Sequence, residues 1–251
     1  MNSELKDALA AQLLAMADDE LLLAHRNAEW IGHAPILEED IALANIAQDE
    51  LGHAMVWYQL HQDLTGLDSD RIVYFRDAAA FRNVQLVEWP KGDWAFTMVR
   101  QFLFDAYELA LFTRLASSSY APLSDAVAKI KNEEVYHYRH SSTWVERLGL
   151  GTEESHSRMQ QALDLLWPLA SQLFESELSQ QLLVELEMFP DLTEVKESWK
   201  SVVIPHFAKA RLDVPEEATM INVSRKIHTD HLDDLLTDLQ QVAREDPEAV
   251  W

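Results

Sequence analysis

Glycine and proline are so rare in this chain that it divides into a few long segments, and this constrains the fold more than any other feature. Only 6 glycines and 8 prolines occur among 251 residues. Alanine, leucine, glutamate and glutamine, which favour helices, dominate the tracts between them. No alternating strand pattern bounded by turn residues extends beyond a few positions. The sequence therefore predicts an all-α protein whose first four long helices cover about Ser3–Glu29, Leu37–Leu64, Asp93–Ser117 and Pro122–Leu148.

The order of these helices predicts a particular bundle. Two long helices are followed by a partly irregular connection, Leu67–Gly92, and then by two more long helices. This is the connectivity of ferritin-like four-helix bundles with a long crossover. We expect further helices to pack on the outside of the bundle, the first of them bent near Pro168. The prediction is one domain over residues 1–251, with a core bundle at about 3–148 and accessory helices at about 153–245, namely Glu153–Glu175, Ser179–Met188, Leu192–Val203 and Thr229–Ala243.

Composition excludes several kinds of function. The net charge of -23 argues against binding nucleic acid or an anionic membrane surface. The absence of cysteine excludes disulfides, thiolate catalysis and iron–sulfur clusters, so any transition metal must be held by histidine and carboxylates. The acidic N-terminal segment does not resemble a signal peptide, and no apolar run approaches the length of a membrane span. We therefore expect a cytoplasmic protein.

Two Glu-x-x-His motifs lie in the second and fourth predicted helices, at Glu50–His53 and Glu134–His137. Residues three apart share one face of a helix, so each pair can bind the same or adjacent metal ions. The motif alone is weak because it arises by chance. A third copy, Glu153–His156, falls at an expected helix start and is interpreted as such a coincidence.

The positions of the first two motifs within their helices strengthen their interpretation as metal ligands. Core stripes drawn at alternating steps of three and four residues contain Glu50 and His53 in one helix, and Glu134 and His137 in the other. Both stripes are otherwise largely apolar. A buried, ionised carboxylate without a partner costs several kcal/mol. The pattern therefore calls for a compensating cation.

The first and third helices each offer one more carboxylate. The first stripe selects Glu20, and its off-stripe neighbours Asp18 and Asp19 are expected to be solvated. In the third helix the stripe selects Asp105, with Glu108 as an alternative ligand or a neighbouring group. The predicted set suits a dinuclear iron site, or manganese, and whether it is loaded stays open. Its members are Glu20, Glu50, His53, Asp105, Glu134 and His137.

Other polar residues have weaker interpretations. Glu133, beside Glu134, and His140, one turn beyond His137, can support metal ligands or simply be solvated or structural. The pair His228 and His231 begins an acidic amphipathic helix, and we interpret it as a capping or interface feature.

Several long stretches resemble the C subunit of the bacterial ring-1,2-phenylacetyl-CoA epoxidases, namely Glu29–Ala54, Phe81–Leu115, Tyr136–Phe174 and His228–Leu236. The resemblance implies a ferritin-like fold and a subunit of a multicomponent oxygenase of phenylacetate degradation. In that family a related A subunit holds the di-iron site and epoxidises the ring, a reductase supplies electrons, and the C subunit is a structural partner whose own site is often degenerate.

This sequence departs from that pattern, because all six predicted ligands stand where the catalytic relative carries its own. The resemblance implies homo- and hetero-oligomers with the homologous catalytic A-type chain and the reductase component. The alternative is an independent ferritin-like di-metal oxidase or metal-storage protein.

Overall fold

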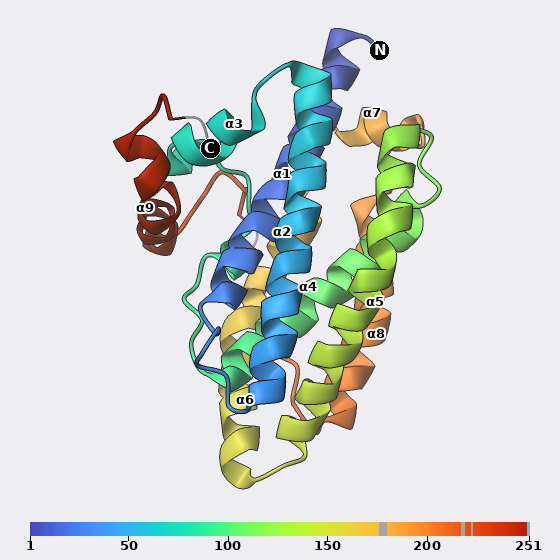
Figure 1. The fold of residues 1–251 in the computed structure, drawn as a ribbon. Coiled ribbons are helices and arrows are strands. Elements are labelled where there is room, and N and C mark those ends of the chain that lie inside the picture. Colours follow the sequence, from blue (N-terminus) through green and yellow to red (C-terminus); the bar gives the residue numbers. More distant parts are fainter. Residues whose placement is uncertain (176–179, 217–218, 222, 250–251) are drawn as a thin grey trace.

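A computed structural model describes residues 1–175, 180–216, 219–221 and 223–249. Within these ranges every regular element is helical, which confirms the all-α prediction. Two antiparallel helix pairs form the bundle (Figure 1). The first pair is α1 (Ser3–Ala28) and α2 (Leu37–Thr65), and the second is α4 (Trp94–Leu115) and α5 (Ala121–Gly149). These bounds agree with the four predicted segments to within a few residues.

Short-range signals in the sequence set the helix ends. Asp93, the predicted start of the third helix, caps α4 by accepting a hydrogen bond from the Phe96 amide at 2.9 Å. Thr152 caps the next helix in the same way, through the Ser155 amide. Helix α2 ends at Gly66, whose φ of 78° lies in the left-handed region that favours glycine.

The predicted crossover joins the two pairs over residues 66–93. It contains one short helix, α3 (Ser69–Phe75), and two 3-10 turns, η1 (Ala78–Ala80) and η2 (Gln85–Val87). The ferritin-like order of two helices, a crossover and two helices is therefore confirmed.

Accessory helices cover the outside of the bundle. Helix α6 (Glu153–Leu166) passes into a 3-10 segment, η3 (Trp167–Phe174), where Pro168 was expected to bend it. Next come α7 (Gln180–Glu185), α8 (Leu192–Lys209) and α9 (Asp230–Glu245). Helix α8 extends beyond the predicted end at Val203, through Pro205. Ser179, the predicted start of α7, lies outside the described residues.

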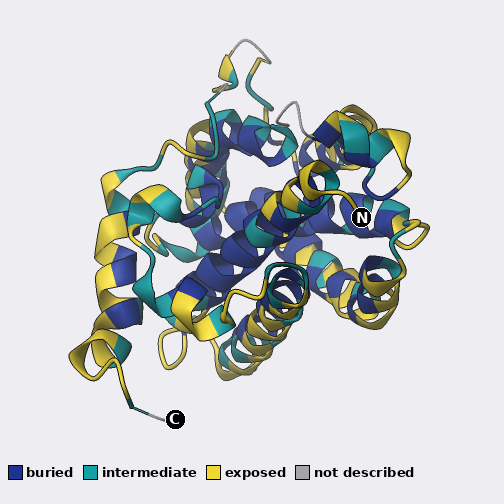
Figure 2. Ribbon diagram, turned by 90° about the horizontal axis from the view of Figure 1, so that it is seen from above, coloured by how far each residue is buried: buried dark blue, intermediate teal, exposed yellow. Residues whose placement is uncertain are grey.

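Helix α4 is buried on almost every side, because α5 covers one face while α6 and α8 cover others. The Phe102 ring on α4 lies 5.8 Å from the Tyr138 ring of α5 and 5.2 Å from the Phe207 ring of α8. Trp199 of α8 is fully buried and donates to the Leu103 carbonyl at 2.9 Å. Figure 2 shows the buried residues gathered along the inner helices, with exposed residues on the outer faces. A helix surrounded in this way is largely apolar on every side, and the few polar residues that it buries need partners within the fold.

The expectation that Asp18 and Asp19 are solvated is wrong. Both are buried, because the crossover and the C-terminal part of the chain cover that face of α1. Asp18 pairs with Arg76 and accepts a 2.6 Å hydrogen bond from Tyr58, and Asp19 pairs with Arg225 at 2.7 Å. The partners lie up to 206 residues away in the chain, so these ion pairs fasten distant segments onto α1.

None of the helices in the described part of the chain is long and apolar enough to cross a membrane.

Candidate metal centre

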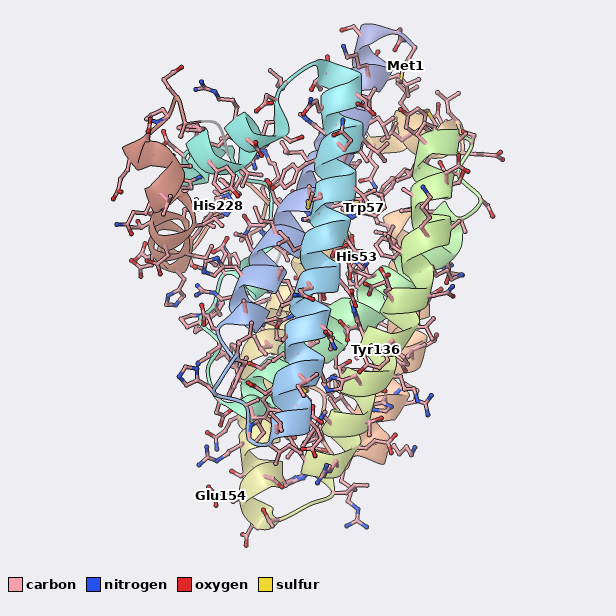
Figure 3. The ribbon with its side chains drawn as sticks, viewed as in Figure 1. Met1, His53, Trp57, Tyr136, Glu154 and His228 are labelled. Atoms are coloured by element: carbon pink, nitrogen blue, oxygen red, sulfur yellow. The ribbon has the colours of Figure 1, made fainter. Side chains whose placement is uncertain are left out.

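The predicted ligand residues lie on the four bundle helices and are buried. Glu20 comes from α1, Glu50 and His53 from α2, and Glu134 and His137 from α5. Helix α4 contributes both Asp105 and Glu108, of which Glu108 is the more exposed at 3%. Figure 3 marks His53 at the middle of α2, one turn before Trp57 and beside α5, which carries Tyr136.

The two histidines turn the same ring atom toward the buried carboxylates. Nδ1 of His53 lies 3.3 Å from an oxygen of Glu20 and 3.3 Å from one of Glu134. Nδ1 of His137 lies 3.1 Å from Glu134 and 3.7 Å from Glu50. The ring centroids are 6.0 Å apart.

The outer nitrogen of each histidine contacts a carboxylate from the opposite helix. Nε2 of His53 (α2) lies 2.8 Å from Glu133 of α5, and Nε2 of His137 (α5) lies 3.3 Å from Asp49 of α2. Outer carboxylates of this kind orient the imidazoles of metal sites and raise their basicity. Glu133 was one of the predicted supporting groups, whereas Asp49 was missed. The signal for both was the acidic residue immediately before each Glu-x-x-His motif.

On α4, Glu108 faces the other carboxylates more directly than Asp105. Among the described residues, two groups of three side chains bring potential ligand atoms within 4.8 Å of one another: Glu20, Glu50 and His53, and Glu50, Glu108 and Glu134. Glu50 belongs to both groups, as a ligand shared by two ions would. Asp105 belongs to neither, and its two oxygens accept hydrogen bonds from Gln101 and Ser141, each at 2.6 Å.

Four carboxylates are only partly satisfied. One oxygen each of Glu20, Glu50, Glu108 and Glu134 is buried and has no hydrogen-bond partner among the residues that the structure describes. Since a buried acceptor without a partner is costly, four of them converging from four helices fit a bound cation. The ligand types, carboxylate oxygen and imidazole nitrogen, suit iron or manganese.

Electrostatic shifts reflect the crowding of these groups. Burial raises the pKa of Glu50 and of Glu108 well above the ordinary value, and neighbouring carboxylates raise both further. Burial also raises the pKa of Asp105 to about 8. Burial would raise the pKa of Glu134 too, but the two histidines outweigh it and lower that pKa to about 2.

The pKa values of both histidines are raised as well, but by the neighbouring carboxylates and not by burial. Burial lowers the pKa of an imidazole, but the carboxylates around it more than offset this effect. They raise the pKa of His53 to about 12, chiefly through Glu20, and that of His137 to about 11, chiefly through Glu134. The cluster therefore favours positive charge at its centre.

Further side chains hold the carboxylates in place. Gln101, which the sequence reasoning missed, donates to Glu50 at 2.9 Å and accepts from Asn27 at 2.9 Å. Trp57 donates to Glu20 at 3.3 Å. The burial of Gln101 is known only from the structure, and nothing in the sequence indicated its partners.

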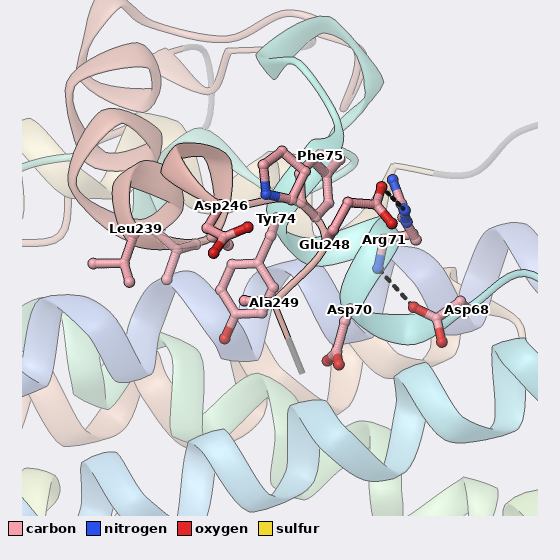
Figure 4. A pocket seen from close by; sticks show the side chains of 12 residues that line it. Asp68, Asp70, Arg71, Tyr74, Phe75, Leu239, Asp246, Glu248 and Ala249 are labelled. Atoms are coloured by element: carbon pink, nitrogen blue, oxygen red, sulfur yellow. Dashed lines mark hydrogen bonds and ion pairs between the residues drawn. The ribbon is translucent and has the colours of Figure 1, made fainter. Parts of the chain in front are cut away.

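The remaining motifs lie elsewhere. Glu153 is exposed and His156 bonds the Gly149 carbonyl, at the start of α6. His228 bonds buried Glu88 at 2.7 Å just before α9, in the interface role that was predicted. A pocket of about 690 Å³ lies between α3 and the end of α9 (Figure 4). No residue of the buried cluster lines it.

Comparisons with known proteins identify one family and two similar proteins. The family described as phenylacetic acid catabolic protein matches residues 1–251. The C subunit of 1,2-phenylacetyl-CoA epoxidase from Escherichia coli (strain K12) is 39% identical over 245 residues, which cover 97% of this chain and 99% of that protein. The A subunit of the same epoxidase is 26% identical over 169 residues, which cover 67% of this chain and 54% of that protein.

Proposed function

Because this chain belongs to the phenylacetic acid catabolic protein family, we propose that it is the C-type subunit of a multicomponent oxygenase that epoxidises the ring of phenylacetyl-CoA. Similarity to the C subunit of the Escherichia coli epoxidase over nearly the full length of both chains supports this role. The weaker similarity to the A subunit supports a partner of related sequence, an A-type catalytic chain. A reductase component completes the complex, which contains several copies of each oxygenase chain.

The same proposal includes a dinuclear iron site in this chain, held by Glu20, Glu50, His53, Glu108, Glu134 and His137. The observation that carries it is the set of four buried carboxylates, each with an unpartnered oxygen, that meet two histidine Nδ1 atoms. One carboxylate from each of four helices and one histidine from each of two is the ligand set of carboxylate-bridged dinuclear proteins. Asp105 is the alternative ligand from α4.

Two bound iron ions would supply reversible one-electron chemistry toward O2. The chain's own residues hold and shield the site. Glu133 and Asp49 keep the imidazoles oriented, Gln101 and Trp57 fix two of the carboxylates, and the apolar stripes exclude water. In the complex this chain serves mainly as the structural partner of the A-type chain and retains a metal site of its own.

Anaerobic reconstitution with ferrous iron tests the site. We expect wild type to bind close to two irons per chain, and a Glu50→Ala/His137→Ala variant to bind well below one. The matched control is Glu153→Ala/His156→Ala, which removes the same motif from the start of α6 and should bind as wild type does. Equal iron binding by wild type and the Glu50/His137 variant would show that the assignment is wrong.

An independent di-metal oxidase or metal store is the second candidate, since the buried cluster suits it equally well. Co-purification separates the two functions. An oxygenase subunit should be recovered in a stable complex with the A-type chain of the same genome, whereas an independent protein should be recovered without it.

A further inference from the structure

The outer face of α2 carries an exposed strip without charge. Between Asp40 and Asp63, the α2 residues that the structure exposes are all uncharged: Ile41, Asn45, Gln48, Leu51, Gly52, Met55 and Gln59. We call these residues the α2 strip. Charged residues make up 25% of the chain, yet between Ile41 and Gln59 the charged side chains of α2 are buried Glu50 and partly exposed Asp49, which contacts His137. Depletion of charge marks the centre of protein interfaces rather than free surface.

Residues along this face of α2, most of them apolar, follow the spacing of a helix-packing seam that begins at Leu37, one turn before the α2 strip. Leu37, Ile41, Ala44, Gln48, Leu51 and Met55 are separated by steps of four and three residues in alternation. Leu37, Ile41, Leu51 and Met55 are 45 to 70% exposed, although each is a large apolar side chain. Such a seam accepts another helix that packs along it. The opposite stripe of α2 already faces the bundle core.

A shallow groove and an unusual glycine make close packing possible. The strip borders a groove of about 270 Å³ between α1 and α2, lined by apolar side chains that include Leu21, Ile31 and Leu51. Gly52 lies in the middle of α2, where a Cβ would meet nothing within 4 Å. Glycine is unfavourable inside a helix, and no neighbour in the described part of the chain requires it here. Its effect is to leave the backbone of α2 open to close approach by another chain.

The charges at the two ends of the α2 strip indicate which kind of partner helix can bind there. Glu38, Glu39 and Asp40 precede it and Asp63 follows it, and α2 contains no lysine or arginine. If a second copy packed α2 against α2, acidic residues would face acidic residues in either orientation. A partner helix whose apolar seam is flanked by lysine or arginine complements the strip instead.

We propose that the α2 strip is the docking surface for an amphipathic, basic-flanked helix of the A-type chain. This inference rests on the proposed function, in which that chain is the partner. The sequence similarity to the A subunit indicates that such a partner is itself built of long helices. Docking there would cover the outer side of the helix that supplies Glu50 and His53.

The test measures binding of the full-length protein to the purified A-type chain of the same genome by biolayer interferometry. Leu51→Glu and Met55→Glu each place a charge on the strip and should weaken binding about tenfold or more. The matched control is Leu165→Glu on α6, because Leu165 is 43% exposed and Leu51 is 45% exposed. The control should bind within about twofold of wild type.

Gly52→Leu separates docking from folding. The new side chain has open space in this protein and replaces a helix-breaking residue, so the Tm should stay the same or rise. Binding to the A-type chain should nevertheless weaken, because the partner helix packs where the side chain would extend.

Three results would overturn the inference. Unchanged binding by Leu51→Glu and Met55→Glu, with wild type binding normally, would place the interface elsewhere and leave the proposed function intact. A wild-type dimer that Leu51→Glu dissociates would assign the strip to a second copy. Complete failure of wild type to bind the A-type chain would overturn the proposed function as well.

Discussion

Asp49 and Glu133 determine which way the two histidine rings face. Each contacts Nε2 of the histidine on the opposite helix, and Nδ1 then points toward the buried carboxylates. Without metal, both ring nitrogens have carboxylate neighbours, which agrees with the raised pKa of each histidine. A metal ion must displace the Nδ1 protons, so metal affinity should rise with pH.

The raised pKa values predict how the stability of the metal-free protein depends on pH. The folded chain retains protons on His53, His137 and Asp105, whose pKa values are about 12, 11 and 8. The unfolded chain loses them near the ordinary values of 6.5 and 3.8. Because the folded state binds more protons than the unfolded state, stability should fall as the pH rises from about 7 to about 9.

Urea unfolding of the metal-free protein at several pH values within this window measures the effect. Glu134, whose pKa is lowered from 4.5 to about 2, contributes only below its ordinary pKa and does not alter the trend. A His53→Gln/His137→Gln variant should show a shallower dependence. An unfolding midpoint that stays constant or rises across the window in wild type would contradict the expectation.

Helix α4 shows where residue-level prediction from the sequence stopped. Glu50, His53, Glu134 and His137 could be selected because one face of α2 and one face of α5 are solvated, so a single stripe marks the core. The stripe of α1 selected Glu20 as well, but α1 is buried on every side there, which is why the stripe misplaced Asp18 and Asp19. Helix α4 is covered on all sides, and Asp105 and Glu108 are both buried. Stripe phase cannot distinguish two buried positions one turn apart. That choice depends on which carboxylate already accepts hydrogen bonds from neighbouring side chains. Asp105 accepts them from Gln101 and Ser141.

This distinction gives a prediction for the ligand on α4. Glu108→Gln should lower the affinity for cobalt(II), followed by its visible absorption, about tenfold or more, because an amide cannot replace the carboxylate whose oxygen is free to bind the ion. Asp105→Asn should have a smaller effect, since an amide can keep one of the two hydrogen bonds. The reverse order of the two effects would identify Asp105 as the ligand.

At the scale of elements, the crossover is held to α1 by buried charges that no local pattern could predict. Helix bounds follow from nearby caps and breakers, and they were predicted to within a few residues. The partners of Asp18 and Asp19 lie 58 and 206 residues away, so only the tertiary fold brings them together. A carboxylate outside the core-facing stripe is solvated when only one face of its helix is covered. It is buried where a later segment of the chain covers the other face as well.

Removing one partner of such a pair tests its contribution. Asp18→Asn leaves Arg76 largely buried without its counter-charge and weakens the contacts to Tyr58 and the Arg82 amide. The free energy of unfolding should fall by about 3 kcal/mol. The control is Glu154→Gln, which breaks an exposed pair with Arg158 and should leave the free energy of unfolding nearly unchanged, because solvent screens that pair. Equal losses of unfolding free energy in the two variants would show that the buried ion pair stabilises the fold no more than the exposed one does.

At the scale of the whole molecule, the accessory helices contribute to the hydrophobic core and are not peripheral additions to the bundle. Trp199 of α8 stacks on Trp167 of η3 with centroids 5.2 Å apart, and it bonds the backbone of α4. Without these elements, α4 would expose Phe102, Leu103 and their neighbours to water. The sequence predicted that these helices pack outside the bundle, but not that the central helix depends on them.

We therefore propose that residues 1–251 unfold as one domain. Calorimetry of the metal-free protein should give a single transition whose calorimetric and van't Hoff enthalpies agree. A chain ending at Leu150 retains the four bundle helices but loses the cover of α4, so it should show no cooperative thermal transition by circular dichroism. Burial of a large apolar side chain contributes roughly 1.5–3 kcal/mol. The free energy lost by exposing several such side chains around Phe102 would therefore exceed the net stability of an ordinary domain. Cooperative unfolding of the shortened chain would show instead that the bundle is an independent domain.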